Sequence, residues 1–184
     1  MRAGEVLAAL QGRLGERLRN PEVKAETVGY RHPRERECLW AEIAREDLLE
    51  AVRTLKELAP LHISIISGAD VGDRIELIYH FAVGYGTETG EVMVNLRLAV
   101  PKDDPVVPSL CDLIPGAQTT EREKIEFLGV EFQGIPDTRK LFLPDDLAVH
   151  PWRKDEPELA GYVRRTVAWE EKGDEGKGEA RREG

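Results

Sequence analysis

The sequence predicts an α+β fold: a two-layer sandwich of order α-β-β-α-β-β-β with a mainly antiparallel or mixed sheet, followed by a short helix and an extended C-terminal arm. Three observations predict it. Two stretches repeat apolar residues at helical spacing, several shorter stretches alternate apolar and polar residues, and a later region is dense in proline, glycine and charge. Packing helices on one face of such a sheet buries both apolar surfaces in two layers.

The first helix is predicted from an apolar stripe that ends at Asn20-Pro21. Gly12 and Gly15 lower its intrinsic helix propensity, so packing against the rest of the domain must stabilise it. The stripe consists of Val6, Leu7, Leu10, Leu14 and Leu18.

Two strands and a second helix come next. Residues 23–30 predict a weak strand and residues 37–43 a stronger one. The inward residues expected in the stronger strand are Leu39, Ala41 and Ile43. Residues 46–58 predict an amphipathic helix whose apolar face is directed to the core. That face consists of Leu48, Leu49, Val52, Leu55 and Leu58.

Three further strands complete the predicted sheet. They cover residues 61–67, 74–83 and 91–100, and a Gly-Thr loop at 84–90 joins the last two. The third has the clearest alternation of apolar and polar residues. The expected inward residues are Leu61, Ile63 and Ile65 in the first, Ile75, Leu77, Tyr79 and Phe81 in the second, and Val92, Val94, Leu96, Leu98 and Val100 in the third.

Residues 119–155 predict a short helix and an irregular arm. Thr120 and Glu123 form a capping box that predicts the helix start, and Gly129 is the expected stop. Prolines at 136, 144 and 151 break further regular structure. Irregular segments of this length are usually functional or disordered, and the apolar residues here argue against disorder and favour an arm that lies on another surface. Those residues are Phe132, Ile135, Leu141, Phe142, Leu143 and Trp152.

The expected domain organisation is an α+β domain at 1–118, the short helix and interaction arm at 119–169, and a charged tail at 170–184. Ten of the fifteen residues in the tail are charged, four are Gly and one is Ala. Such a composition cannot bury apolar area, so we expect disorder there.

A series of short motifs occupies the region from Asp104 to Asp155. They are Asp104–Leu110 (DPVVPSL), Pro115–Ala117 (PGA), Glu121–Glu123 (ERE), Phe127–Val130 (FLGV), Phe132, Gly134, Pro136-Asp137, Arg139, Leu143–Asp146 (LPDD), His150-Pro151 and Arg153–Asp155 (RKD). In order and spacing this series resembles the thirty-kilodalton-type (C-type) subunit of respiratory complex I and of related membrane-bound, energy-converting nickel–iron hydrogenases.

Five positions depart from the family's pattern. Thr119-Thr120 stand where the family usually has Trp-Tyr, and Ile135 stands where it has His. Lys140 replaces a second Arg, and Glu126 replaces Asp. These departures favour a hydrogenase-type or other ferredoxin-linked relative over the NADH-linked complex itself.

The resemblance implies a non-catalytic structural or assembly subunit in the peripheral arm of a membrane-bound, complex I-like redox complex. Its expected partners are a large catalytic-type (D-like) subunit and a small iron–sulfur (B-like) subunit, with a ferredoxin-like subunit as a further candidate. The partners would carry iron–sulfur clusters and, in a hydrogenase, nickel–iron, on the cytoplasmic side of the cell membrane. The residues expected to contact partners are Glu121, Arg122, Glu123, Phe132, Pro136, Asp137, Arg139, Pro144, His150, Pro151, Trp152, Arg153, Lys154 and Asp155.

Composition limits the function classes. The net charge of −9, from 26 basic and 35 acidic residues, argues against general nucleic-acid binding. No stretch approaches the ~18 apolar residues that span a bilayer, so a membrane location is expected only through partners. The charged fraction of 33% beside few Asn and Gln residues is typical of hyperthermophile proteins.

Chemistry-bearing residues are sparse. None of the four histidines (His32, His62, His80 and His150) has a second His or Cys at ligand spacing, and the chain has no Cys-x-x-Cys. Cys38 and Cys111 lie too far apart in sequence to indicate a disulfide framework. We therefore expect no catalytic residue, metal or cofactor in this chain.

Two alternatives remain open at this level. The first is the corresponding C-type subunit of an NADH- or reduced-cofactor:quinone oxidoreductase. The second, from a different class, is a free-standing small-molecule-binding or enzyme domain with its pocket over the sheet.

Overall fold

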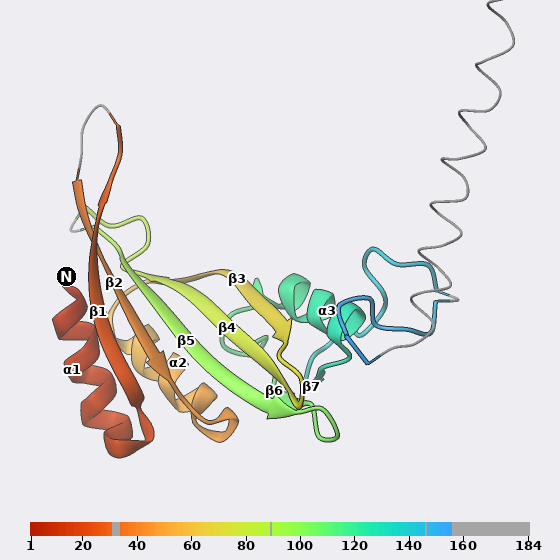
Figure 1. Ribbon diagram of the computed structural model, residues 1–184. Coiled ribbons are helices and arrows are strands. Elements are labelled where there is room, and N and C mark those ends of the chain that lie inside the picture. The colour runs from red at the N-terminus through yellow and green to blue at the C-terminus, as the bar shows by residue number, and fades with distance from the viewer. Residues whose placement is uncertain (31–33, 89, 146, 156–184) are drawn as a thin grey trace, which may run out of the picture.

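A five-stranded sheet with helices on one face organises the chain in the computed structural model, which describes residues 1–30, 34–88, 90–145 and 147–155 (Figure 1). The predicted α+β order is confirmed. The elements are α1 (Ala3–Leu14), β1 (Arg19–Val28), β2 (Arg34–Glu42), α2 (Leu48–Leu58), β3 (Leu61–Asp70), β4 (Arg74–Val83), β5 (Val92–Pro101), β6 (Val106–Pro108), α3 (Ala117–Leu128) and β7 (Glu131–Gln133). The expected tail at 170–184, and residues 156–169 before it, lie outside the described residues.

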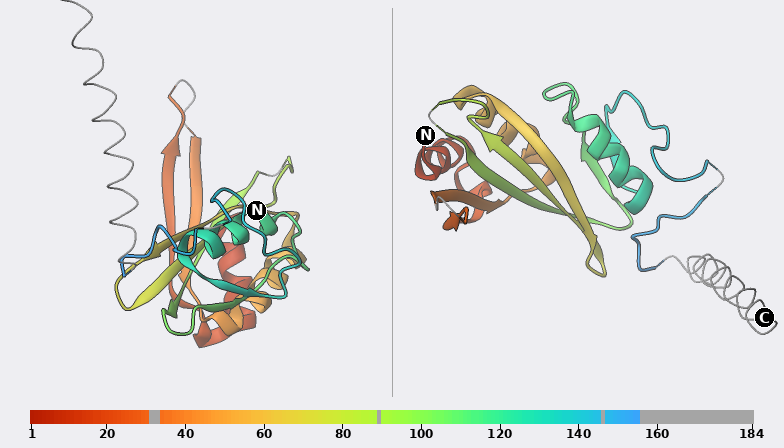
Figure 2. Two further views of the ribbon diagram at one scale, coloured as in Figure 1. Left: turned by 90° about the vertical axis from the view of Figure 1, so that its right-hand side faces the viewer. Right: turned by 90° about the horizontal axis from the view of Figure 1, so that it is seen from above.

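The strand order in the sheet is β1-β2-β5-β4-β3. Only the central pair β2–β5 is parallel among these five strands; the other neighbours pair antiparallel, as the prediction of a mainly antiparallel or mixed sheet requires. Helices α1 and α2 lie against one face of the sheet, and α3 lies beside the edge strand β3 (Figures 1 and 2). The inward residues predicted for β2, β4 and β5 are all buried.

Helix α1 buries Val6, Leu10 and Leu14 of the predicted stripe but ends six residues before Asn20, so Leu18 is buried from outside the helix. It stops at Leu14, and the 3-10 turn η1 (Gly15–Arg17) leads directly into β1. The β1–β2 register shifts between Arg19 and Glu22, where Asn20 has a positive φ of 47° and is followed by a proline. The Asn-Pro signal therefore marks an irregularity inside a strand rather than the end of the helix.

The inward face predicted for β3 is wrong beyond its middle. Ile63 is buried as expected, but Ile65 is 45% exposed and Ile66 is fully buried. The pairing of β3 with β4 shifts register between Ile63 and Ile65, which is a bulge. Because side chains alternate along a strand, one extra residue moves every later residue to the opposite face.

The predicted capping box of the third helix is also wrong. Helix α3 begins at Ala117 with Gly116 as its N-cap, three residues before Thr120. The Thr120 hydroxyl instead accepts the backbone N–H of Ile66 at 2.8 Å and so fastens the helix to the edge strand. The predicted stop is confirmed, since Gly129 adopts the left-handed conformation with φ 68°.

Close approach of α3 to β3 depends on Gly68. A Cβ on this glycine would lie 2.5 Å from Leu128 Cδ1 and 3.3 Å from Lys124 Cδ. Beyond the helix, β7 pairs with β6 in a small parallel sheet that the sequence did not predict. This pairing places Phe132 in the hydrophobic core beside Val107.

Among the described residues, no helix combines the length and the apolar character that crossing a membrane would need.

Candidate interaction surface

The structure shows how the chain holds its C-terminal arm, here residues 134–145 and 147–155. The arm lies against helix α3, and the charged residues of this helix have different roles. Glu121 faces the core, Arg122 and Glu126 hold the arm, and Glu123 pairs with the buried Lys124 at 2.7 Å.

Glu121 is fully buried and organises the loop that precedes α3. Its carboxylate accepts the hydroxyl of Ser109 and the backbone N–H of Leu110, both at 2.6 Å, and the thiol of Cys111 at 3.4 Å. Burial raises the pKa of Glu121, and the hydrogen bonds from Ser109 and Leu110 oppose that rise. The structure places this predicted contact residue inside the chain's own core.

Arg122 binds the start of the arm. Its guanidinium donates to the carbonyl oxygens of Arg139 at 2.8 Å and of Lys140 at 2.9 Å. It also lies 3.6 Å from the Asp137 carboxylate, which receives a bidentate pair from Arg139. The hydrogen bond from the Arg139 guanidinium is the main cause that holds the pKa of Asp137 well below its ordinary value.

Glu126 is the second attachment of the arm, and it is buried. Its carboxylate accepts three successive backbone N–H groups, those of Leu141 at 3.2 Å, Phe142 at 3.0 Å and Leu143. Three converging N–H donors form a site for a carboxylate. The arm therefore turns around a side chain of the helix, and its backbone has little freedom at these three residues.

Lys140 closes the following turn from inside the arm. Its ammonium donates to the carbonyl oxygens of Pro144 at 2.8 Å, Asp145 at 3.2 Å and Leu147. These three backbone carbonyls are thereby satisfied without regular secondary structure.

An aromatic stack attaches the last part of the arm. The backbone N–H of Trp152 donates to the backbone carbonyl oxygen of Phe127 at 2.9 Å. The two aromatic rings stack with their centroids 4.5 Å apart. The Lys124 ammonium lies 4.7 Å from the centroid of the Trp152 ring, within the range of a cation–π interaction. His150 pairs through Nδ1 with the carbonyl oxygen of Glu126 at 3.0 Å.

Gly129 is required where this attachment meets the helix end. We expect Gly129→Ala to lower the free energy of unfolding by about 1–3 kcal/mol, because a positive φ of 68° strains any residue with a Cβ. The new Cβ would also lie 2.7 Å from His150 Cδ2. Urea denaturation of the isolated chain measures the change.

Gly12 in α1 is the matched control for that substitution. It has open space where a Cβ would be added, and it is a glycine inside a helix. We expect Gly12→Ala to raise the free energy of unfolding by about 0.5–1 kcal/mol. Equal effects at both glycines would contradict a special role for position 129.

An ionic cluster fixes the end of the arm to the β3–β4 hairpin. The buried carboxylate of Asp70 accepts the Lys102 ammonium at 2.6 Å, the N–H of Lys154 at 2.7 Å and the N–H of Gly72 at 2.9 Å. Burial by itself would raise the pKa of Asp70, but these donors outweigh it and hold the pKa at about 2. Lys102 also pairs with Asp155 at 3.2 Å.

Of the residues predicted to contact partners, those that are exposed rather than partly buried lie on the arm. The Arg139 side chain is 84% exposed although it pairs with Asp137, and Trp152 is 41% exposed. Phe142, which the sequence analysis assigned only to the arm's apolar residues, is 66% exposed. The remaining predicted contacts (Pro136, Pro144, Pro151, Arg153, Lys154 and Asp155) belong to the same arm, whereas Phe132 packs in the core.

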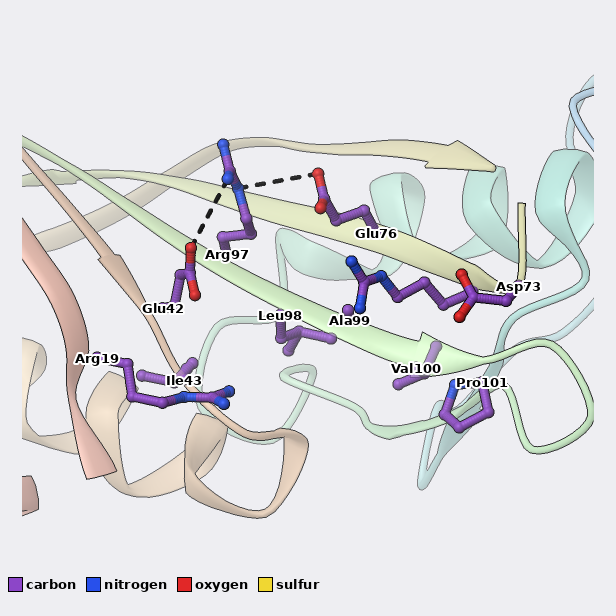
Figure 3. Close-up of a pocket in the computed structure, with 11 residues that line it drawn as sticks. Arg19, Glu42, Ile43, Asp73, Glu76, Arg97, Leu98, Ala99, Val100 and Pro101 are labelled. Carbon is purple, nitrogen blue, oxygen red and sulfur yellow. Dashed lines mark ion pairs between the residues drawn. The ribbon is translucent and has the colours of Figure 1, made fainter. Parts of the chain in front are cut away.

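A surface pocket beside the sheet does not favour a small-molecule site. It measures about 550 Å³ and lies at the ends of β4 and β5, where cations and acids alternate (Figure 3). Arg97 lies between Glu42 and Glu76, at 3.8 Å from each. Ligand pockets are usually apolar with a few convergent polar groups, and this one is predominantly charged.

Three hydrogen-bonded polar side chains on the sheet face that the helices leave uncovered were not predicted from the sequence. His80 contacts the Ser67 hydroxyl at 3.0 Å through Nε2 and the Asn95 side-chain oxygen at 2.7 Å through Nδ1. The antiparallel pairing of β4 with β5 could have revealed this contact, because it places His80 and Asn95 directly opposite each other on neighbouring strands. Among the described residues no group of three or more His, Cys, Asp or Glu side chains could hold a metal ion.

Comparison with known proteins gives one family and several relatives. Residues 41–162 match the family described as "Respiratory-chain NADH dehydrogenase, 30 Kd subunit". The beta subunit of the membrane-bound hydrogenase of Pyrococcus furiosus is 37% identical over 147 residues, which cover 78% of this chain and 82% of that protein. The C-type subunit of the NADH-quinone oxidoreductase of Mycobacterium sp. (strain KMS) is 34% identical over 83% of this chain, and the match spans 65% of its length.

Two solved structures share the fold. A chain of the membrane-bound sulfane sulfur reductase, an archaeal respiratory membrane complex, matches with a TM-score of 0.68 and 23% identity over 90% of this chain and 91% of that chain. The trypsin-resistant fragment of Nqo5 matches with a TM-score of 0.56 and 24% identity over 74% of this chain and 99% of the fragment.

Proposed function

Because the chain belongs to the 30-kDa subunit family of respiratory-chain NADH dehydrogenase, we propose that it is a non-catalytic assembly subunit of a membrane-bound, complex I-like redox complex. At the coarser level, it is a subunit of a complex I-like or membrane-bound hydrogenase complex. The finer proposal is that its arm docks on a large catalytic-type subunit and on a small iron–sulfur subunit, on the cytoplasmic side of the membrane.

The observation that carries this proposal is the arm itself. It has little regular secondary structure, yet Arg122, Glu126 and Asp70 hold its backbone at three separate places. A segment that is already ordered loses less conformational entropy when it binds a partner. The chain thus presents a preformed surface rather than a reactive site.

The hydrogenase type is the version of the complex that we favour. The hydrogenase relative has the higher identity of the two and is matched over 82% of its length, whereas 65% of the mycobacterial protein is matched. The alternative, the C-type subunit of an NADH:quinone enzyme, is supported by the family's description.

Affinity purification from the cells that make the protein tests the proposal. A tagged chain, extracted with mild detergent, is expected to retain a large subunit and an iron–sulfur subunit in equal amounts. Stoichiometric nickel in that complex would identify a hydrogenase, and its absence would favour another acceptor. Recovery of the chain alone from extracts that contain both other subunits would contradict the assembly role.

The same chain expressed alone is expected to contain no stoichiometric iron, nickel, zinc or flavin. In this proposal the clusters belong to the partner subunits, and the described residues contain no group of metal-binding side chains. Elemental analysis and an absorbance spectrum measure this directly. A stoichiometric metal in the isolated chain would require a ligand set that the proposal does not include.

A further inference from the structure

We propose that Phe142 and Trp152 form the anchor by which the arm binds an apolar pocket of the large subunit. This inference rests on the function proposed above. Phe142 is 66% exposed and Trp152 is 41% exposed, and both rings contact Phe127 of α3 at centroid distances of 6.2 and 4.5 Å. Exposed aromatic clusters of this kind are typical of the residues that dominate binding at protein interfaces.

The rings are presented by a rigid backbone. The N–H of Phe142 is one of the three held by the Glu126 carboxylate, and the N–H of Trp152 is held by the carbonyl oxygen of Phe127. Large side chains on an ordered backbone lose little entropy on binding. Such residues therefore bind more tightly than the same side chains on a flexible segment.

The arm's charges do not supply an equivalent attraction. Arg139 forms a bidentate pair with Asp137 through contacts of 2.7 and 3.0 Å, and Arg153 pairs with Asp155 at 3.0 Å. A new partner for Arg139 must compete with this existing pair, so the gain is small. We therefore place the main binding contribution on the aromatic rings and not on the guanidinium of Arg139.

A protein pocket fits this surface better than a lipid surface does. Residues 134–155 contain four basic residues (Arg139, Lys140, Arg153 and Lys154) and four acidic ones (Asp137, Asp145, Asp146 and Asp155), so the arm carries no net charge. The whole chain has a net charge of −9. Binding to anionic lipid needs an excess of basic residues beside the aromatic ones, and the arm lacks it.

Co-expression of the chain with a tagged large subunit tests the anchor. We expect Phe142→Ser and Trp152→Ser each to reduce the amount of chain retained on the large subunit at least tenfold. Tyr85→Ser is the control, because Tyr85 is also an exposed aromatic residue, at 54%, but lies in the β4–β5 loop. The control is expected to be retained like the wild type. The melting temperature of each isolated variant shows whether it still folds.

The outcomes separate this inference from the proposed function. If the wild type is retained and Phe142→Ser, still folded, is retained equally, the anchor is wrong and the assembly role stands. Equal losses for Phe142→Ser and Tyr85→Ser would also overturn the anchor. If the wild type is not retained, the proposed function and the anchor both fail. Binding of the wild-type chain to phosphatidylglycerol vesicles, lost in Phe142→Ser, would replace the protein partner with a membrane.

Discussion

Replacing Glu121 by alanine is expected to lower the free energy of unfolding of the isolated chain by about 2–4 kcal/mol. The carboxylate is fully buried and accepts hydrogen bonds from Ser109, Leu110 and Cys111. Its removal leaves a buried hydroxyl and a buried backbone N–H without an acceptor, and each such group costs about 1–3 kcal/mol. Urea denaturation near pH 7 measures the loss.

Two further variants show whether the loss comes from the buried carboxylate of Glu121. Glu131→Ala removes an exposed glutamate from β7 and is expected to change stability by less than about 0.5 kcal/mol. Glu121→Gln keeps the shape and one acceptor oxygen, so its loss should be smaller than that of Glu121→Ala. Unchanged stability in Glu121→Ala would mean that the cost of burying the carboxylate cancels its hydrogen bonds.

The raised pKa of Glu121 adds a pH dependence with a definite sign. A carboxyl group whose pKa is higher in the folded state than its ordinary value of 4.5 binds its proton more tightly when folded. The part of the stability that comes from this pKa difference is therefore complete below about pH 4.5 and declines as the pH rises through the folded pKa, whereas the hydrogen bonds from Ser109 and Leu110 contribute at every pH. The advantage of the wild type over Glu121→Gln should shrink over that interval.

Asp70→Asn is expected to lower the free energy of unfolding by about 2–3 kcal/mol at pH 7, because it breaks a buried ion pair with Lys102. The pH dependence has the opposite sign to that of Glu121. The pKa of Asp70 falls from 3.8 to about 2 on folding, so its contribution is present above about pH 4 and is lost as the pH falls towards 2. Stability of the wild type and of Asp70→Asn, measured between pH 2 and 7, tests both statements.

Asp73→Asn is the matched control for Asp70, since Asp73 lies three residues away and is exposed. We expect little change in stability from it at any pH. If the wild type kept its full advantage over Asp70→Asn at pH 2, the ion pair with Lys102 would not be the source of that stability.

Asp70→Asn should also loosen the arm, because its carboxylate holds the N–H of Lys154. Amide hydrogen exchange at residues 150–155 would then increase relative to the wild type. This expectation links the stability of the domain to the order of the surface that we propose for docking.

The strands whose alternation is regular could be predicted from the sequence alone. In β4 and β5 each inward residue is apolar and each faces a regular antiparallel neighbour, so burial follows directly from the period of two. The family could likewise be identified from short motifs, because the prolines, glycines and charged residues between residues 104 and 155 occur in the same order and spacing as in the family. Gly129 was predicted as a helix end for the same local reason.

Other features depend on contacts between residues distant in sequence. Thr120 is a residue type that caps helices, but its hydroxyl accepts the backbone N–H of Ile66, 54 residues earlier. The bulge between Ile63 and Ile65 moves the later side chains of β3 to the opposite face of the sheet. Glu121 and Glu126 look alike in the sequence as polar residues of a surface helix. One stabilises a buried loop and the other holds the arm.

The sequence by itself determined the fold class, the order of the helices and of the strands in the main sheet, and the family, because these follow from local periodicity and motif spacing. Only the tertiary structure decided which charged residues form hydrogen bonds and ion pairs within the chain and which side chains remain available to a partner. A hydrogen bond or an ion pair is made by whichever donor and acceptor the fold brings within about 3 Å, and sequence spacing does not specify that distance across 15 to 84 residues.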